Sequence, residues 1–512
     1  MNLELDLGNP SFTLLHRAGL AGLWMTLNQL KKEKIEVPNG LDWQLSERQV
    51  QLNCNGNDRE ILEWLLKESF QLNNGIITLR GLDSKSMRED VQIIIHQGIL
   101  GTLLQHTITH KSDGIVTKSL SLGEDELEIQ VKYKSLQSYV YQEFAANLCD
   151  KNGKLRTEYI SVAGWLNPGA VVKHVAFSSD TSFKELPENA FVLLFAPVAC
   201  YYYILGSKLR DKRAQYALVV PEVTDLEKYA QFRQNPNLRN ATYKDFHASG
   251  LGDAGLKFLT LNTTVNIAQT FNVQRCQVLT LGTVAWSTQQ KTRTDLYVVE
   301  VTDEVCHNYQ VCDDWLKDEA IAGKDGGFVV TSFAKELIAE NLVKKLPWYF
   351  GISDKVNSNK LFQYLAYERG GLYQVIQKIH SDEREKLFVK ACHEAIQYTF
   401  GKIADVATKR GESPNFDRET VRIRTGLGRC KNSETFREFI TDFWSRAGKI
   451  PTLQKHWEEL MDFVMSDKNW KKSRDLALLA LASYKGKGDY NQSKQDVNEV
   501  DNNDEDMIDI GL

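Results

Sequence analysis

The clearest pattern of hydrophobic and polar positions lies in residues 276–301, where the two kinds alternate along two runs that flank a polar segment. Val278, Trp286 and Val298 are among the apolar positions, which are rich in β-branched and aromatic side chains. Alternation with a period of two predicts a pair of antiparallel strands joined by a loop. We expect residues 288–293 to form that loop.

Before about residue 330, strand-like and helix-like patterns follow one another without a regular βαβ alternation, which favours an irregular α+β fold. Residues 12–32 have helical periodicity and several Gly and Ala residues. Glycine costs about 1 kcal/mol in a helix relative to alanine, so we expect a neighbouring element to pack closely against that face. The apolar run 191–205 is interpreted as a buried strand.

After about residue 330 the strand patterns fade, and apolar residues recur at helical spacing, for instance at Leu387 and Ala391. The last residues are polar, acidic and nearly free of aromatic side chains. We therefore predict an α+β region over residues 1–330, a helical bundle over residues 331–488 and a disordered acidic tail over residues 489–512.

The composition is that of an ordinary globular protein, with 42% hydrophobic and 25% charged residues in a chain of 512. Of the formal net charge of −5, residues 489–512 contribute −7, so residues 1–488 carry +2. The acidic balance therefore does not exclude nucleic acid as a partner. No apolar run is long enough to span a bilayer, the N-terminus lacks the basic start of a signal peptide, and the eight cysteines are scattered. These features predict a soluble, cytoplasmic protein.

One short motif could indicate a nucleotide cofactor. Gly250, Gly252 and Gly255 have the spacing of the dinucleotide fingerprint, which requires a strand before it and a helix after it. A polar stretch precedes these glycines, so we interpret them as part of a flexible loop. The phosphate-binding pattern G-x-x-x-x-G-K-[ST] does not occur, and no cofactor is predicted.

Candidate metal ligands are sparse as well. His106 and His110 stand four residues apart, and Cys306 and His307 lie near Cys312, but neither group has the four ligands and spacing of a zinc finger. Ordinary histidines and buried thiols explain both groups better. We predict no catalytic residues and no metal site.

The polar segment of the hairpin contains residue types that read duplex DNA. A two-stranded ribbon fits the major groove, where Gln can pair with adenine, and Lys or Arg with guanine. A solvated hairpin tip is the simpler alternative, because loops are usually polar. The candidates for contact with the duplex are Gln289, Gln290, Lys291 and Arg293.

Two further segments are candidates for binding a nucleic-acid backbone. The first is a basic turn with a lysine farther along the chain, formed by Asn152, Lys154, Arg156 and Lys173. The second is rich in arginine, which suits planar phosphate contacts, although a solvated helix surface is the default interpretation. We expect Gly426 and Gly428 to interrupt its helix. Its members are Lys409, Arg410, Arg418, Arg422, Arg424 and Arg429.

Four longer blocks resemble the signature blocks of one family. They are LLHRAGLAGLWMTL at 14–27, YISVAGWLNPGAVVKH at 159–174, CQVLTLGTVAWSTQQK at 276–291 and NLVKKLPWYFGI at 341–352. In length and order they are similar to the large subunit of the type I CRISPR surveillance complex, Cascade, in its Myxan (type I-B-related) branch. The helical segments FDRETVRIRTGLGRCK and FITDFWSRAGKIP resemble the same family more loosely.

The resemblance implies a subunit without catalysis of its own. Such subunits recognise the protospacer-adjacent motif in duplex DNA and help to open the duplex, so that the guide RNA (crRNA) pairs with the target strand and forms an R-loop. The implied partners are crRNA, double-stranded target DNA, the backbone, guide-end and small subunits of Cascade, and either a helicase-nuclease or transposition proteins. The implied role is antiviral defence or transposon targeting.

The resemblance also suggests roles for the candidate residues. The hairpin would contact the motif, the 152–156 turn would hold guide RNA or duplex backbone, and the arginine-rich segment would bind phosphates of the displaced strand. The helical bundle would resemble the small Cascade subunit. Two rival functions stay open, namely a metal-dependent nuclease acting on DNA and a purely structural assembly scaffold.

Overall fold

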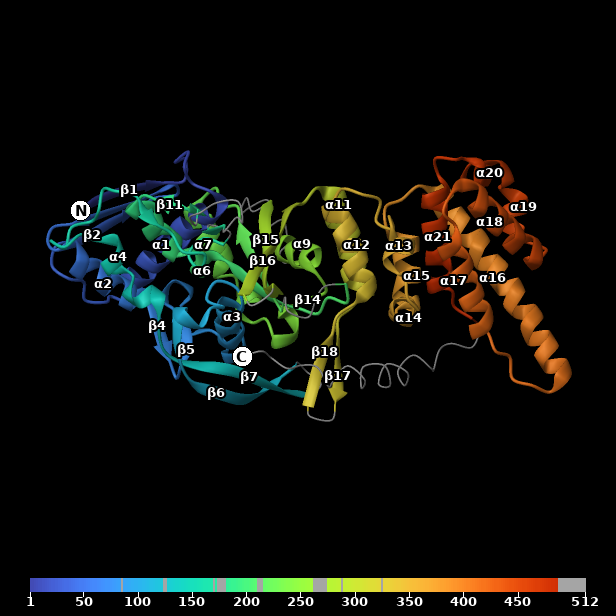
Figure 1. The fold of residues 1–512 in the computed structure, drawn as a ribbon, viewed down its shortest axis with the longest axis horizontal. Coiled ribbons are helices and arrows are strands. Elements are labelled where there is room, and N and C mark those ends of the chain that lie inside the picture. The colour runs from blue at the N-terminus through green and yellow to red at the C-terminus, as the bar shows by residue number, and fades with distance from the viewer. Residues whose placement is uncertain are drawn as a thin grey trace. The chain divides into compact units, whose positions relative to one another are not determined.

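The structure, a computed structural model, describes residues 1–83, 86–122, 127–168, 171–172, 181–209, 215–260, 274–286, 289–323 and 326–486. The chain divides into two compact units, the first comprising residues 1–301 and 318–331 and the second residues 302–317 and 332–512. The described strands all lie in the first unit, and the described part of the second unit is helical (Figure 1). The predicted α+β fold with a helical C-terminal region is confirmed.

The first unit combines several small sheets and ribbons with helices. Grouped by sheet in hydrogen-bonded order, its strands are β1 (Asn2–Asp6), β3 (Gln49–Cys54) and β2 (Leu41–Leu45); β4 (Phe70–Asn73) and β5 (Ile76–Leu79); β6 (His110–Ser121) and β7 (Glu128–Tyr139); β11 (Lys184–Glu185) and β8 (Ile160–Ser161); β10 (Thr181–Ser182) and β9 (Val171–Val172); β14 (His247–Ala248), β12 (Tyr201–Leu205), β13 (Tyr216–Pro221), β15 (Arg275–Trp286) and β16 (Gln289–Glu300); β17 (Glu319–Gly323) and β18 (Gly326–Val330). Its helices are α1 (Leu14–Lys32), α2 (Asp58–Ser69), α3 (Glu89–Gly101), α4 (Ala145–Leu148), α5 (Pro187–Leu194), α6 (Ala196–Ala199), α7 (Leu226–Arg233), α8 (Pro236–Arg239) and α9 (Leu251–Thr260).

Helix α1 lies in the core of the first unit, and Thr13 caps its N-terminus. A Cβ atom on Gly19 would lie 2.2 Å from the carbonyl oxygen of Val192 in α5. A Cβ atom on Gly22 would lie 2.0 Å from the carbonyl oxygen of Phe195, which joins α5 to α6. These two helices are therefore the close neighbour that the small residues of α1 predicted.

The position of α5 and α6 shows that the prediction of a buried strand over residues 191–205 is wrong. Residues 191–205 do not form one buried strand, because α5 and α6 extend to Ala199 and β12 begins only at Tyr201. A run that is apolar on all sides has no periodicity that distinguishes a buried helix from a buried strand. Pro187 in the first turn of α5 favours the helix, since its fixed φ suits that position.

The five-stranded sheet of the first unit ends in the long β15–β16 hairpin. Arg275 pairs with Glu300 at its base and Trp286 with Gln289 at its far end, which confirms the predicted strand pair. The predicted loop over residues 288–293 is wrong, because β16 already begins at Gln289. Threonines alternate with long polar residues there, and such a sequence fits a strand. Only residues 287–288 separate the two strands.

Helix α9 packs on this sheet. A Cβ atom on Gly255 would lie 2.6 Å from Val299 Cγ2, so the glycine permits the close approach. The three fingerprint glycines follow β14 and reach into α9, so their interpretation as a flexible loop is wrong. The Ser249 backbone N–H donates to Asp253 Oδ2 at 2.7 Å, which puts a negative charge near the N-terminus of α9. That charge disfavours a phosphate at this position.

The second unit is a helical bundle. Its helices are α11 (Asp303–Trp315), α12 (Phe333–Val343), α13 (Ile352–Lys355), α14 (Asn359–Tyr367), α15 (Arg369–Lys378), α16 (Glu383–Arg410), α17 (Asp417–Arg429), α18 (Ser433–Ala447), α19 (Pro451–Lys455), α20 (Trp457–Met465) and α21 (Trp470–Ser483). The longest, α16, packs against α18, α20 and α21, and Phe388 stacks on Phe463 with ring centroids 5.1 Å apart.

The prediction that Gly426 and Gly428 interrupt their helix is wrong, because α17 continues through both residues. Gly426 fits against the ring of Phe439, which a Cβ atom would approach to 2.3 Å. Close packing therefore favours glycine at this position. Of the helices in the described part of the chain, none combines the length and apolarity needed to cross a membrane.

Candidate nucleic-acid interface

The base of the β15–β16 hairpin is held by a cluster of charges. Arg275 donates from Nε to Glu222 Oε2 at 2.9 Å and from Nη2 to Glu222 Oε1 at 2.6 Å. Its Nη1 lies 3.7 Å from Glu300 Oε1, and Arg17 Nη1 on α1 lies 3.9 Å from Glu222 Oε1. Together these contacts link the two hairpin strands with β13 and α1.

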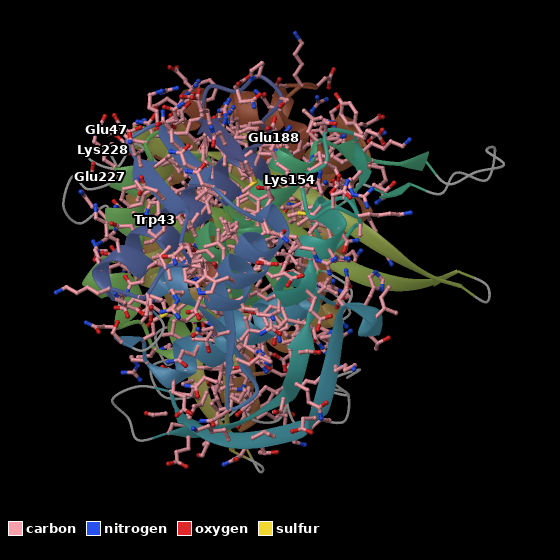
Figure 2. The ribbon with its side chains drawn as sticks, turned by 90° about the vertical axis from the view of Figure 1, so that its left-hand side faces the viewer. Trp43, Glu47, Lys154, Glu188, Glu227 and Lys228 are labelled. Atoms are coloured by element: carbon pink, nitrogen blue, oxygen red, sulfur yellow. The ribbon has the colours of Figure 1, made fainter. Side chains whose placement is uncertain are left out.

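The far end of the hairpin carries the first group of predicted site residues. Gln290 pairs with Ala285, Lys291 with Val284 and Arg293 with Gly282. Gln289, Lys291 and Arg293 thus occupy alternate positions of β16 rather than a loop. Their side chains lie outside the described residues. Figure 2 shows the hairpin backbone projecting from the body of the first unit.

The second predicted group forms a tight turn that rests on the start of α2. The N–H groups of Asn152 and Lys154 both donate to Asp150 Oδ1 at 2.9 Å. Lys154 Nζ donates to the carbonyl oxygen of Gly56 at 2.8 Å and lies 3.6 Å from Asp58 Oδ1. Lys154 is exposed, but its ammonium group is already engaged by these two contacts within the first unit.

Asp58 is the buried group that organises this turn. It accepts a hydrogen bond from the Leu155 N–H at 3.1 Å and lies 3.1 Å from the N-terminal amine of Met1. Burial raises the pKa of Asp58, but the Leu155 hydrogen bond and the Met1 ammonium lower it by more. The pKa of Asp58 therefore lies below its usual value. Arg156 stays exposed while its Nε donates to the Cys149 carbonyl oxygen at 2.8 Å. The predicted companion Lys173 lies outside the described residues.

The arginines of α17 differ in how far their charges are already used. Arg422 pairs with Glu419, its Nε donating to Oε2 at 2.8 Å, and this hydrogen bond raises the pKa of Arg422. Arg424 donates to the side-chain oxygen of Asn359 at the start of α14. Arg418 and Arg429 are exposed, and neither forms an ion pair with another described residue. At 3.6 residues per turn Arg418, Arg422 and Arg429 share one helical face.

Lys409 and Arg410 belong to a separate place in the second unit. They are exposed in the last turn of α16. Phe416, just before α17, stacks on Phe400 with ring centroids 4.8 Å apart. Phe400 precedes Lys409 by nine residues on α16. The start of α17 therefore lies beside a point of α16 that is roughly 14 Å along the helix from Lys409. The structure therefore divides the six predicted basic residues into two groups.

Sequence reasoning missed a cleft in the first unit, a cavity of about 630 Å³ between α1, β2 and α7. Its lining includes the half-buried indole of Trp43, side-chain amides and two lysines. Figure 2 views the first unit from the side on which Trp43, Glu47, Glu227 and Lys228 lie. No single motif marks this cleft, because its walls come from segments about 200 residues apart in the chain.

The described residues offer little for metal or nucleophilic chemistry. Within them, no group of three or more His, Cys, Asp or Glu residues is arranged to hold a metal ion. Cys306 is partly exposed and Cys312 is buried, and neither forms a disulfide. Burial raises the pKa of Cys200 to about 12 and that of Cys430 to about 11, so these thiols are poor nucleophiles.

Comparison with known proteins gives two results. The DevT N-terminal domain matches residues 4–194, and the DevT C-terminal domain matches residues 377–511. The chain is also 26% identical to the CRISPR-associated protein Cas8a1/Csx13 of Myxococcus xanthus (strain DK1622). That alignment extends over 541 residues and covers 97% of this chain and 91% of the relative.

Proposed function

This chain belongs to the DevT family, in the Myxan branch of large CRISPR subunits that its sequence resembles, and from this premise we propose that it is the large subunit of a crRNA-guided type I CRISPR complex. In that complex it recognises the protospacer-adjacent motif and supports opening of the duplex. It performs no bond-breaking chemistry of its own. Pairing between crRNA and the target strand supplies the rest of the sequence specificity.

The observation that carries this proposal is the extent of the similarity. The two DevT domains match in chain order, and the alignment with the CRISPR-associated relative covers nearly the whole of both proteins. The similarity therefore extends over most of the chain rather than over one shared domain.

The β15–β16 hairpin is our candidate for the motif reader. A two-stranded ribbon can enter the major groove, and Gln289, Gln290, Lys291 and Arg293 supply groups that pair with adenine and guanine. The Arg275–Glu222 pair supports this role, since it fixes the base of the hairpin and so limits the freedom that binding would remove.

Backbone contacts have two candidate sites. Asn152, Lys154 and Arg156 form a basic turn in the first unit, and Lys154 has part of its charge neutralised by Asp58. In the second unit Arg418 and Arg429 present exposed guanidinium groups on one face of α17. We assign the α17 face to the phosphates of the displaced single strand, because such contacts need charge and little sequence readout.

The decisive experiment is a binding screen of the assembled complex against a library of duplexes that share one target but differ in the flanking sequence. We expect binding to depend strongly on a few flanking base pairs, and Gln289→Ala with Gln290→Ala to flatten that dependence. Equal binding to every flank would contradict motif reading. Metal-dependent cleavage of DNA by the purified chain would favour the rival nuclease function, and crosslinks to protein neighbours alone would favour a scaffold.

A further inference from the structure

The cleft between α1, β2 and α7 lies apart from every residue assigned above. Its volume of about 630 Å³ is in the range of small-ligand pockets, which hold about 300–1,000 Å³. Trp24 forms part of its wall and donates from Nε1 to the carbonyl oxygen of Ser46 at 3.0 Å. Trp43 lines it from the edge strand β2.

Of the four side-chain amides that line the same cavity, Gln234 is bonded to Lys32 and the other three come one from each wall. They are Asn28 of α1, Gln44 of β2 and Gln231 of α7. Within the described part of the chain none of the three amides, nor the Trp43 indole N–H, has a hydrogen-bond partner. Solvent can satisfy each group separately. Their convergence on one cavity, beside a half-buried aromatic ring, is the arrangement of a binding pocket with a few orienting polar groups.

The charges of the cleft are arranged unevenly. Lys31 and Lys32 in the last turn of α1 line one side and are exposed. Lys32 Nζ donates to Gln234 Oε1 at 3.4 Å, while Lys31 forms no ion pair with another described residue. Glu227, in the first turn of α7, is the acidic residue that lines the cleft.

We propose that this cleft holds one unpaired nucleotide of a nucleic-acid strand, with its base against Trp43 and its phosphate near Lys31 and Lys32. The inference rests on the proposed function, since it assumes that the chain handles nucleic acid. Indole rings stack on bases, and Gln or Asn amides bond the edges of bases, most readily those of adenine. The two lysines supply the phosphate contact, and Glu227 accepts from a base amino group or a ribose hydroxyl.

The test uses the full chain and labelled single strands of ten nucleotides, made as RNA and as DNA, each with and without a central run of abasic sites. Trp43→Ala should lower affinity for the base-containing strand about tenfold and leave affinity for the abasic strand unchanged. Trp457→Ala is the matched control, because Trp457 is 54% exposed on α20 in the second unit.

A second variant tests the same cleft independently, in case Trp43→Ala does not fold. Gln44→Ala with Gln231→Ala changes two exposed positions and should weaken binding several-fold, most for adenine-rich strands. Tighter binding of RNA than of DNA would assign the nucleotide to the guide, and the reverse would assign it to a DNA strand. Crosslinking of 5-bromouracil strands should place the adduct on a peptide that contains Trp43.

Two outcomes would overturn the inference. One is an equal loss of affinity on base-containing and abasic strands, which would show that the cleft residues do not contact a base. The other is unchanged binding by both cleft variants, or no binding of single strands at all, while the assembled complex still recognises its target duplex. In that case the proposed function survives and only the nucleotide site is lost. Failure of the assembled complex to bind any target would instead remove the proposed function.

Discussion

Arg275 and Glu222 are joined by two parallel hydrogen bonds at the foot of the β15–β16 hairpin, Nε to Oε2 at 2.9 Å and Nη2 to Oε1 at 2.6 Å. Glu222 directly follows β13, and Arg275 is the first residue of β15. The hydrogen bonds and the charge of Glu222 raise the pKa of the Arg275 guanidinium. The pair therefore connects the edge hairpin to the interior of its sheet through a two-point contact of fixed geometry.

Replacing Arg275 with alanine should affect the hairpin more than the overall stability. The ion pair is partly exposed, so we expect its loss to cost at most about 1 kcal/mol in the free energy of unfolding. Amide hydrogen exchange in β16 should become faster, and discrimination between flanking sequences should weaken. Arg59→Ala is the matched control, because Arg59 pairs with Glu63 on the surface of α2 at 2.8 Å. Equal effects of both variants on exchange in β16 would contradict the role of Arg275.

Changing Gln289 and Gln290 to alanine should weaken target binding in a way that depends on the flanking base pairs. A bidentate amide–adenine contact contributes about 1–3 kcal/mol of discrimination, so we expect a loss of tenfold or more on the preferred flank and little change on the others. Electrophoretic mobility shifts with the assembled complex measure this. An equal loss on every flank would mean that the hairpin does not read the motif.

The exposed arginines and the engaged arginines of α17 allow a comparison within one helix. Arg418→Ala with Arg429→Ala removes two exposed charges, whereas Arg422 and Arg424 are already engaged by Glu419 and Asn359. Each single-strand phosphate contact adds about 0.7 to the slope of log affinity against log salt concentration. We expect the first pair to lower the slope by about 1.4, and the same change at Arg422 and Arg424 to lower it less. Equal slopes in all proteins would refute phosphate binding by this face.

The sequence predicts features whose signal is local. The alternation over residues 276–301 requires a strand pair, and the glycines of residues 12–32 require a close neighbour, and both features are present. The misassigned run 191–205 is buried up to residue 203, so its pattern contains no face that would distinguish a helix from a strand. The prediction of a loop over residues 288–293 makes the loop too long, because polar residues also occur in exposed strands.

The candidate site shows a different limit. Asn28, Trp43 and Gln231 line one cleft although each lies on a separate element of ordinary composition. Their convergence depends on how α1, β2 and α7 pack together, which no short window of sequence contains. Arg422 is likewise paired because Glu419 lies one turn earlier, and only geometry distinguishes it from Arg418, which forms no ion pair with another described residue. Charge counts predict that a surface is basic, whereas packing decides which charges remain available.

Two glycines in helices offer a matched pair for stability. Gly22→Ala would place Cβ 2.0 Å from the Phe195 carbonyl oxygen in the core of the first unit, which should destabilise that unit by about 1–3 kcal/mol or more. Gly401→Ala lies on α16, where the new Cβ would meet no described atom within 4 Å beyond its own stretch of helix, and should stabilise the second unit by about 0.5–1 kcal/mol. Denaturant unfolding followed by circular dichroism measures both. Unchanged or increased stability of the first unit in Gly22→Ala would contradict the packing of α1 on α5 and α6.

Glu368 predicts a pH dependence for the second unit. Its Oε1 accepts hydrogen bonds from the N–H groups of Phe333 at 2.8 Å and Ala334 at 3.2 Å, at the N-terminus of α12. Burial raises the pKa of Glu368 to about 7, although these hydrogen bonds and that of Ser332 oppose the shift. The folded state therefore binds this proton more tightly than the unfolded chain, whose pKa is near 4.5.

The sign of the effect follows from that difference. Stability from protonated Glu368 is fully present below about pH 4.5 and is lost as the pH rises through about 7, because the folded state must then hold a partly buried charge. Glu368→Gln cannot ionise, so we expect its melting temperature to rise relative to that of the natural chain between pH 5 and pH 8. Comparison of the two proteins at each pH cancels any constant cost of the amide at the helix terminus. A difference in melting temperature that stays the same across this range would contradict the raised pKa of Glu368.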